Sequence, residues 1–186
     1  MSVGPYPLIY NIIKETSKKH EVFVIASGWP KRPAQEIIDG IKVYRTPSIN
    51  FGIEKENIIS LGLVGLPVVL REKPQVINSQ GFDGALLFKL LNLIRNKTKK
   101  ILAVKSIMKA RLKGQKIKLN LEDTIRVNGQ KMFEQIAAKN SDYFVVQSKY
   151  AKKELLNLLK VNPKKINLIY NGVNCELFKP TKKKNK

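Results

Sequence analysis

Several residue types on which whole classes of protein depend are scarce in this chain. Its 186 residues include one histidine, His20, and one cysteine, Cys175. A single cysteine cannot form an internal disulfide, and no paired cysteines or histidines have the spacing of a metal site. The lone histidine has no partner for a Ser/His/Asp set, and no phosphate-binding P-loop motif occurs. We therefore predict no metal site, no bound cofactor and no catalytic residue of these kinds in this chain.

Long hydrophobic runs are also missing. The longest, residues 58–70, contains Pro67 and falls short of the about 18 apolar residues that a membrane-spanning helix needs. No secretory signal opens the chain, and an unpaired cysteine suits a reducing compartment. These features predict a single cytoplasmic domain that is long enough to bury a core without disulfides.

Acidic residues are few. Basic residues outnumber them 35 to 14, and the resulting formal charge of +21 attracts phosphates, anionic lipids or nucleic acids. The basic residues are dense in residues 97–118, where Ile101, Leu102 and Ile107 interleave with them. Specific nucleic-acid binding is not expected, because no aromatic residues alternate with the lysines and no binding module is recognisable.

Two hypotheses account for residues 97–118. One lays the segment on an anionic membrane at its inner face, in contact through Lys105, Lys109, Arg111, Lys113 and Lys116. The other is a buried strand followed by a basic loop in solvent. We favour the second, because charge runs are usually solvated.

The clearest pattern lies in the C-terminal third. Residues 143–146 and 166–170 are apolar runs of strand length, and Ser148 suits the N-cap of a helix between them. That helix should stop at Asn162-Pro163. Its apolar face is expected to carry Ala151, Leu155, Leu158 and Leu159. Its polar face is expected to carry Lys152, Lys153, Glu154 and Asn157. A strand, a helix and a strand in this order predict a βαβ unit with parallel strands.

The rest of the chain repeats this alternation. Apolar runs predict strands at residues 22–26, 41–45, 75–78 and 101–104. Helical spacing predicts helices at residues 58–71, 85–94 and 121–140, and another after Gly4-Pro5 with Leu8, Ile12 and Ile13 on its apolar side. Residues 28–39 are expected to form a loop. We predict an α/β, Rossmann-like open parallel sheet with helices on both faces, in which strand 22–26 is buried on both sides.

Two stretches carry a family resemblance. Residues 142–180 combine the βαβ unit with Asn-Gly-Val-Asn and a Phe-Lys-Pro ending, and residues 73–84 combine Lys-Pro-Gln-Val-Ile-Asn-Ser-Gln-Gly with the start of a helix. Their order resembles the N-terminal domain of family-four retaining glycosyltransferases, which are two-domain enzymes of the GT-B fold. The resemblance extends over residues 4–180. It implies a glycosyltransferase N-terminal domain at residues 1–175, with an interdomain-linker remnant and a basic tail at residues 176–186, truncated at both ends.

The resemblance also implies a function. In the family, transfer of a sugar from a nucleotide-sugar donor depends mainly on the C-terminal domain, and the chain ends where that domain would begin. We expect an acceptor-binding half that is inactive alone and needs a separate donor-binding half to glycosylate a lipid or saccharide acceptor. The residues expected to contact substrates are Gly4, Asn78, Gln80, Gly81, Ser106 and Arg111. Asn78, Gln80 and Ser106 stand near positions where the family carries histidine, and they hydrogen-bond hydroxyls without titrating near neutrality.

Two alternatives stay open. The chain is either this acceptor-binding half, or a non-catalytic remnant or binding module that associates with an anionic membrane or a protein partner. At the level of the loop, Gly81 and Gly84 either let a backbone approach a ligand or only shape the turn from strand to helix.

The centre of the sheet carries a further expectation. In the family, a first strand and a glycine-rich loop precede the first helix, and here only Gly4 stands for that loop. We expect a sheet that lacks a central or near-central strand, or one that something else completes. Two strands would then expose unpaired backbone, which favours association with a partner.

Overall fold

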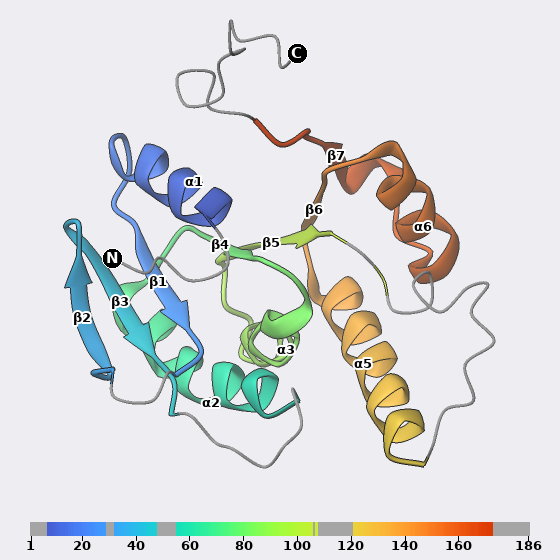
Figure 1. Ribbon diagram of the computed structural model, residues 1–186, viewed down its shortest axis with the longest axis horizontal. Helices are drawn as coiled ribbons and strands as arrows, with labels where there is room; N and C mark the ends of the chain where they lie inside the picture. Colours follow the sequence, from blue (N-terminus) through green and yellow to red (C-terminus); the bar gives the residue numbers. More distant parts are fainter. Residues whose placement is uncertain (1–6, 29–31, 48–54, 106, 108–120, 173–186) are drawn as a thin grey trace, which may run out of the picture.

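The computed structural model describes residues 7–28, 32–47, 55–105, 107 and 121–172 of the chain. Strands and helices alternate along it, as the sequence pattern predicts (Figure 1). The helices are α1 (Pro7–Ser17), α2 (Lys55–Glu72), α3 (Ala85–Leu93), α5 (Leu121–Asn140) and α6 (Lys149–Leu159), with the short 3-10 helices η1 (Phe82–Gly84) and η2 (Pro163–Lys165). The strands are β1 (Phe23–Ala26), β2 (Gln35–Ile38), β3 (Ile41–Arg45), β4 (Val76–Ser79), β5 (Lys99–Val104), β6 (Tyr143–Val146) and β7 (Ile166–Leu168).

The strands form a sheet in two parts. β4, β5, β6 and β7 lie side by side in that order and are all parallel. β1, β3 and β2 form the other part, in which β1 and β3 are parallel. Among the described residues, β1 has no partner on the side away from β3, and β4 has none on the side away from β5. The α/β fold is confirmed, and in this part of the chain the sheet lacks a strand in its middle, as expected.

The βαβ unit of the C-terminal third is confirmed. β6 and β7 are parallel neighbours on either side of α6 in the chain. Ser148 caps α6, because its hydroxyl accepts a hydrogen bond from the backbone N–H of Ala151 at 3.0 Å. The helix ends at Leu159, ahead of the proline, and Lys160 follows it in the left-handed region with φ 50°.

Glu154 contradicts the expected polar face of α6. Its side chain is 8% exposed and lies on the buried face with Ala151 and Leu155. Position 154 comes three residues after Ala151 and four before Leu158, and residues at these spacings share one face of a helix. The expectation was wrong because it followed the polarity of the residue and not its position.

Residues 28–39 are not all loop, because they contain β2. β2 pairs with β3 in an antiparallel hairpin, with Ile38 opposite Ile41. The two connecting residues, Asp39 and Gly40, have φ of 49° and 79°, the geometry of a two-residue turn whose twist matches that of the strands. An Asp-Gly pair is a strong hairpin signal, so this strand was predictable from the sequence.

Two N-terminal elements are less buried than the sequence predicts. Every residue of β1 is half-buried, because the strand has a neighbour on one side only. In α1, Leu8 and Ile13 are half-buried, whereas Ile12 is exposed.

Most of the core lies between the four-stranded part of the sheet and helices α3, α5 and α6. Its fully buried side chains include Phe88, Leu102, Phe144, Val146 and Leu155. Across the described ranges, we find no helix that is both long enough and apolar enough to cross a membrane.

α2 and α3 join the two parts of the sheet. The helices approach closely at Gly62, where an added methyl carbon would lie 2.5 Å from Leu86 Cγ. Next to this contact lies an apolar cluster to which α2, α3, β1 and β4 all contribute: Val69, Leu87 and Leu91, with Leu66, Ile25 and Ile77 packed against them. The same two helices therefore support the inner strand of each part of the sheet.

The close approach predicts different effects for Gly62→Ala and Gly65→Ala. Both glycines lie within α2, so both substitutions gain about 1 kcal/mol of helix propensity. The new methyl group at Gly62 meets Leu86 Cγ at 2.5 Å, whereas at Gly65 the nearest atom is Leu87 Cδ2 at 3.3 Å, the end of a flexible side chain. In urea unfolding, Gly62→Ala should have a free energy of unfolding about 1–3 kcal/mol below that of Gly65→Ala, the usual cost of overpacking. Equal stabilities would contradict the close contact.

Candidate functional site

The loops that follow the parallel strands meet at one edge of the sheet, where ligands bind in folds of this class. After β4 the chain turns at Gly81 into η1 and then into α3. Gly81 has φ 116° and ψ −168°, a conformation that residues with a side chain rarely adopt. A methyl carbon added at Gly81 would meet no described atom within 4 Å. The turn therefore favours glycine through its backbone angles, and the space beside it is open.

Gly84 has a different role in the same turn. A methyl carbon added there would lie 2.6 Å from the hydroxyl oxygen of Ser79. That hydroxyl donates to the carbonyl of Gly81 at 2.8 Å and accepts from the N–H of Gly84 at 3.2 Å. Of the two interpretations of these glycines, turn shaping holds for Gly84. The open space at Gly81 leaves room for an approaching ligand.

Sequence reasoning missed Ser79. Its hydroxyl is engaged by backbone groups on both sides of the turn, so it sets the positions of Gln80 and Gly81 and does not itself face a ligand. The signal was the spacing Ser-x-Gly-x-x-Gly over residues 79–84, because a hydroxyl two residues before a glycine can bond across a tight turn.

Two amide side chains lie at the next strand ends. After β7, Asn171 Nδ2 donates to Oε1 of Gln147, which follows β6, at 3.3 Å. The adjacent Ser148 is engaged as the cap of α6. Within the described residues, no group of three or more His, Cys, Asp or Glu side chains could hold a metal ion. The described part of this edge thus offers neutral hydrogen-bonding groups.

The structure brings together three of the predicted substrate-binding residues. Asn78 is exposed on β4, and Gln80 and Gly81 follow it and are half-buried. Lys105, one of the predicted anion contacts, is exposed at the end of β5, which pairs with β4. The other predicted residues lie outside the described residues: Gly4, Ser106, Lys109, Arg111, Lys113 and Lys116.

The apolar side chains of residues 97–118 do not face a membrane where the structure describes them. Leu102 and Ile107 are 0% and 1% exposed, so both belong to the core. The hypothesis of a buried strand is correct for β5. The basic residues that would follow it, from 108 to 118, lie outside the described residues.

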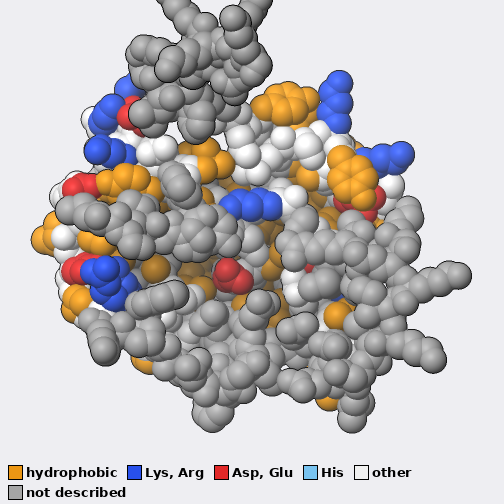
Figure 2. Space-filling view, viewed as in Figure 1, with side chains coloured by type: hydrophobic (Ala, Val, Ile, Leu, Met, Phe, Trp, Pro, Cys, Tyr) orange, Lys and Arg blue, Asp and Glu red, His pale blue; other side chains and the backbone are white. Residues whose placement is uncertain are grey.

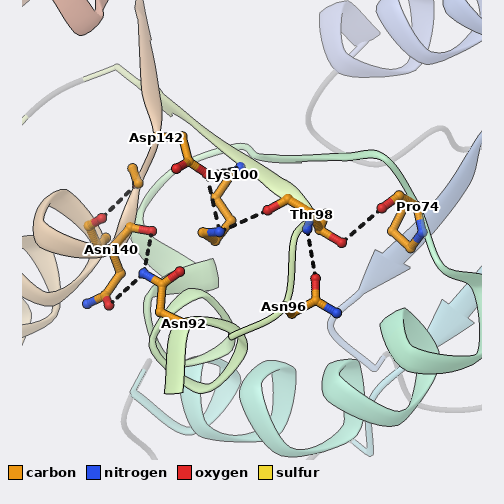
Figure 3. A network of polar contacts seen from close by, with 9 residues as sticks. Pro74, Asn92, Asn96, Thr98, Lys100, Asn140 and Asp142 are labelled. Carbon is orange, nitrogen blue, oxygen red and sulfur yellow. Dashed lines mark hydrogen bonds and ion pairs between the residues drawn. The ribbon is translucent and has the colours of Figure 1, made fainter. Parts of the chain in front are cut away.

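A polar network lies at the opposite edge, where the strands begin (Figure 3). The ammonium group of Lys100, a residue only 4% exposed, donates to the carbonyl of Thr98 at 2.8 Å and pairs with Asp142 Oδ2 at 3.2 Å. Asp142 Oδ2 also accepts from the backbone N–H of Lys100 at 2.8 Å. Nearby, Asn92 Nδ2 donates to Asn140 Oδ1 at 3.0 Å. These contacts fasten β5 to the start of β6, which is a structural role.

The carboxyl group of Asp142 responds to two opposing effects. Burial by itself raises its pKa, but hydrogen bonds from the backbone and the side chain of Lys100 outweigh it, and the pKa lies below its usual value of 3.8. A carboxyl group with a lowered pKa stabilises the folded state above its unfolded pKa. That stabilisation is lost as the pH falls through the folded value.

The sequence and the fold now identify the class of the protein. The sequence matches the profile of Glycosyltransferase Family 4 over residues 8–177, and the chain therefore belongs to this family. No curated protein matches the sequence.

Solved structures with a similar fold come from sucrose-phosphate synthase of Thermosynechococcus elongatus. One superposes with a TM-score of 0.71 at 16% identity, over 93% of this chain and 44% of that chain. A second structure of this enzyme superposes with a TM-score of 0.63 at 14% identity, over 92% of this chain and 86% of that one. The chain thus spans less than half the length of the first structure. At these identities the likeness shows the fold, a Rossmann-like half of the GT-B type.

Removal of the Asp142 carboxylate should cost stability in a pH-dependent way. Asp142→Asn leaves the buried ammonium of Lys100 with the Thr98 carbonyl but without its counter-charge. Loss of one partner of a buried ion pair costs about 3–5 kcal/mol, and because the Asp142 side chain is 35% exposed we expect about 1–3 kcal/mol at pH 7. The difference from the unmodified protein should shrink as the pH falls below the usual carboxyl pKa of 3.8, where the native carboxyl also loses its charge.

The matched control for this prediction is Glu15→Gln. It removes the exposed pair between Glu15 and Lys18, whose side chains are 69% and 61% exposed, and such pairs contribute little. Denaturant unfolding at several pH values measures both variants. A loss for Asp142→Asn that is the same at pH 7 and in acid would show that the ion pair is not its cause.

Proposed function

We propose that this chain is the acceptor-binding half of a glycosyltransferase. In this proposal it works with a separately encoded donor-binding half and holds a lipid or saccharide hydroxyl for transfer of a sugar from a nucleotide-sugar. The observation that carries the proposal is the match to Glycosyltransferase Family 4 over residues 8–177, in a chain that spans 44% of a solved GT-B structure.

The chemistry of the carboxyl edge of the sheet supports acceptor binding. The side-chain amides of Asn78 and Gln80, and of the linked pair Gln147 and Asn171, each carry donors and an acceptor, which suits sugar hydroxyls. None of these amides exchanges a proton near neutral pH, so they can position a hydroxyl but cannot act as a general base. In the proposal, stabilisation of the departing nucleotide falls to the donor half.

The turn after β4 adds positional precision. Gln80 and Gly81 lie between a strand and a helix on a turn that Ser79 closes with two hydrogen bonds. A side chain on such a braced turn loses less freedom when a ligand binds, and this reduces the entropic cost of binding.

The test of this proposal is sugar transfer by the purified chain, alone and with any protein that copurifies from its host. UDP- and GDP-sugars serve as donors and a lipid extract as the acceptor. We expect transfer only in the presence of the copurified protein. Gln80→Ala should then lower kcat/KM about tenfold, the effect of losing about 1.4 kcal/mol from one hydrogen bond to the acceptor.

Gln75→Ala is the matched control. It makes the same substitution at an exposed glutamine before the opposite end of β4, away from the proposed site. Equal losses for the two variants would speak against an acceptor contact at Gln80. No transfer by a folded sample under any of these conditions would overturn the catalytic proposal.

A second candidate function, association with an anionic membrane, is favoured by the surface of α2. Residues 58–70 contain no charged residue, and three apolar side chains on one side of the helix are exposed: Ile59 at 46%, Leu63 at 60% and Leu70 at 44%. They lie at spacings of four and seven residues, which places them on one face. Exposed cations follow the helix, Arg71 and Lys73, and others follow α3, Arg95 and Lys97. An apolar face with a cationic margin suits an anionic bilayer surface.

Lys and Arg side chains elsewhere do not form one dominant patch. On the face shown in Figure 2 they are dispersed among other side chains. A net charge of +21 therefore supports general attraction to anionic lipid, whereas the apolar face of α2 would determine which side of the protein makes contact.

Flotation with vesicles tests the membrane candidate. We expect binding to vesicles of phosphatidylglycerol and phosphatidylcholine and little binding to phosphatidylcholine alone. The combined variant Ile59→Ser, Leu63→Ser and Leu70→Ser should reduce the bound fraction more than tenfold, because each side chain contributes roughly 1 kcal/mol of apolar burial. The control variant Ile37→Ser and Ile38→Ser changes exposed residues of β2 and should bind normally. Unchanged binding by the α2 variant would remove this candidate.

A further inference from the structure

The backbone of β1 and β4 is unpaired along one side of each strand. The Ala26 carbonyl accepts from the N–H of Thr46 at 3.0 Å, so this residue of β1 faces β3. The Gln75 carbonyl accepts from the N–H of Lys99 at 2.9 Å, so the residue before β4 faces β5. Backbone groups alternate in direction along a strand. The residues whose N–H and C=O groups point away from these partners are therefore Phe23, Ile25, Val76 and Asn78, and they have no backbone hydrogen bond to another described residue.

These unpaired sides, which we call the acceptor edges, share an apolar support. Ile25 on β1 and Ile77 on β4 both pack against the buried cluster of α2 and α3 that contains Val69, Leu87 and Leu91. A segment lying along both edges would place alternate side chains on this cluster. Its neighbours in the plane of the sheet would be backbone groups on both sides.

The opposite face of the sheet offers a second apolar surface. α1 precedes β1, and Figure 1 shows it on the side of β1 that faces β4 and β5. Its Leu8, Ile9 and Ile13 are only half-buried. An extended segment at the acceptor edges would therefore be covered by α1 on one face and by α2 and α3 on the other.

We propose that the acceptor edges bind one extended segment of a partner polypeptide, which inserts as a strand between β1 and β4. Only an extended backbone presents a row of donors and acceptors to both edges at once; a lipid or the surface of a folded second copy does not. Apolar surfaces on both faces select valine, isoleucine or leucine at successive positions and exclude proline. β1 and β4 each have four residues, so the occupant would pair over a similar length. This inference does not depend on the catalytic proposal.

Hydrogen exchange on the full chain tests the insertion. The probe is a short synthetic peptide of valine and isoleucine flanked by lysines. We expect it to slow exchange of the β1 and β4 amides about tenfold or more, which corresponds to about 1.4 kcal/mol of added protection. The same peptide with a central proline should have no effect. Amides of β2 and β7, the outer edges of the sheet, are the internal control and should not change.

Val76→Pro examines the acceptor edge directly. Val76 begins β4, and its side chain is 51% exposed; its N–H points away from β5, so proline removes a donor to the occupant and none to β5. The variant should fold with near-normal stability and lose the peptide-induced protection. Val76→Ala should retain it.

Several outcomes would overturn the inference. Slow exchange of β1 and β4 in a dilute monomer without peptide would mean that the chain already completes its own sheet. Protection that grows with protein concentration, without peptide, would identify a second copy as the occupant. Equal protection of β2 and β7, or full protection in Val76→Pro, would indicate non-specific strand addition.

Discussion

The packing of α2 against α3 is the contact on which the rest of the structure depends. Among the described residues, no backbone hydrogen bonds join β1 to β4, so the two parts of the sheet are positioned by the helices that both of them contact. Gly62 allows this packing, because any side chain there would meet Leu86. In an uninterrupted sheet, paired strands fix the register of every element in discrete steps. Here side-chain packing alone sets the relation between the two parts, which makes this relation more sensitive to single substitutions than the strands themselves.

The two edges of the sheet divide structural and binding roles. At the edge where strands begin, Lys100 and Asp142 are satisfied by each other and by neighbouring backbone. At the edge where strands end, Gln80 and Gly81 lie half-buried beside open space. Ionisable groups in a cleft often mark a functional site, but a buried ion pair whose members are fully engaged by the protein is better explained as a fastening. The family match supports the other edge, because the fold class binds ligands there.

Periodicity predicted most of the fold, and it failed where geometry was local or depended on a neighbour. α5 was predicted with its observed bounds, Leu121–Asn140, and β6 likewise, because both are long or strongly apolar runs with clear ends. Glu154 was misplaced because polarity was given more weight than helical spacing. β2 was missed although Asp39-Gly40 announced its hairpin. The half-buried state of β1 depends on an absent neighbour, so its own residues do not encode it. For the site, the sequence identified Asn78, Gln80 and Gly81 through the family resemblance, but the bracing role of the Ser79 hydroxyl depends on how the turn closes.

Strand pairing and substrate binding meet at β4. The backbone of Asn78 belongs to the unpaired side of this strand, and Gln80 follows two residues later on the turn that Ser79 closes. A strand held by hydrogen bonds on both sides has less freedom than one held on a single side, so an occupant at the acceptor edges would restrict the positions of the Gln80 amide. Part of the ordering cost would then be met before an acceptor binds, and occupancy would raise acceptor affinity without touching the acceptor. The reverse also follows from linkage: an acceptor that orders Gln80 would favour insertion of the strand by the same factor.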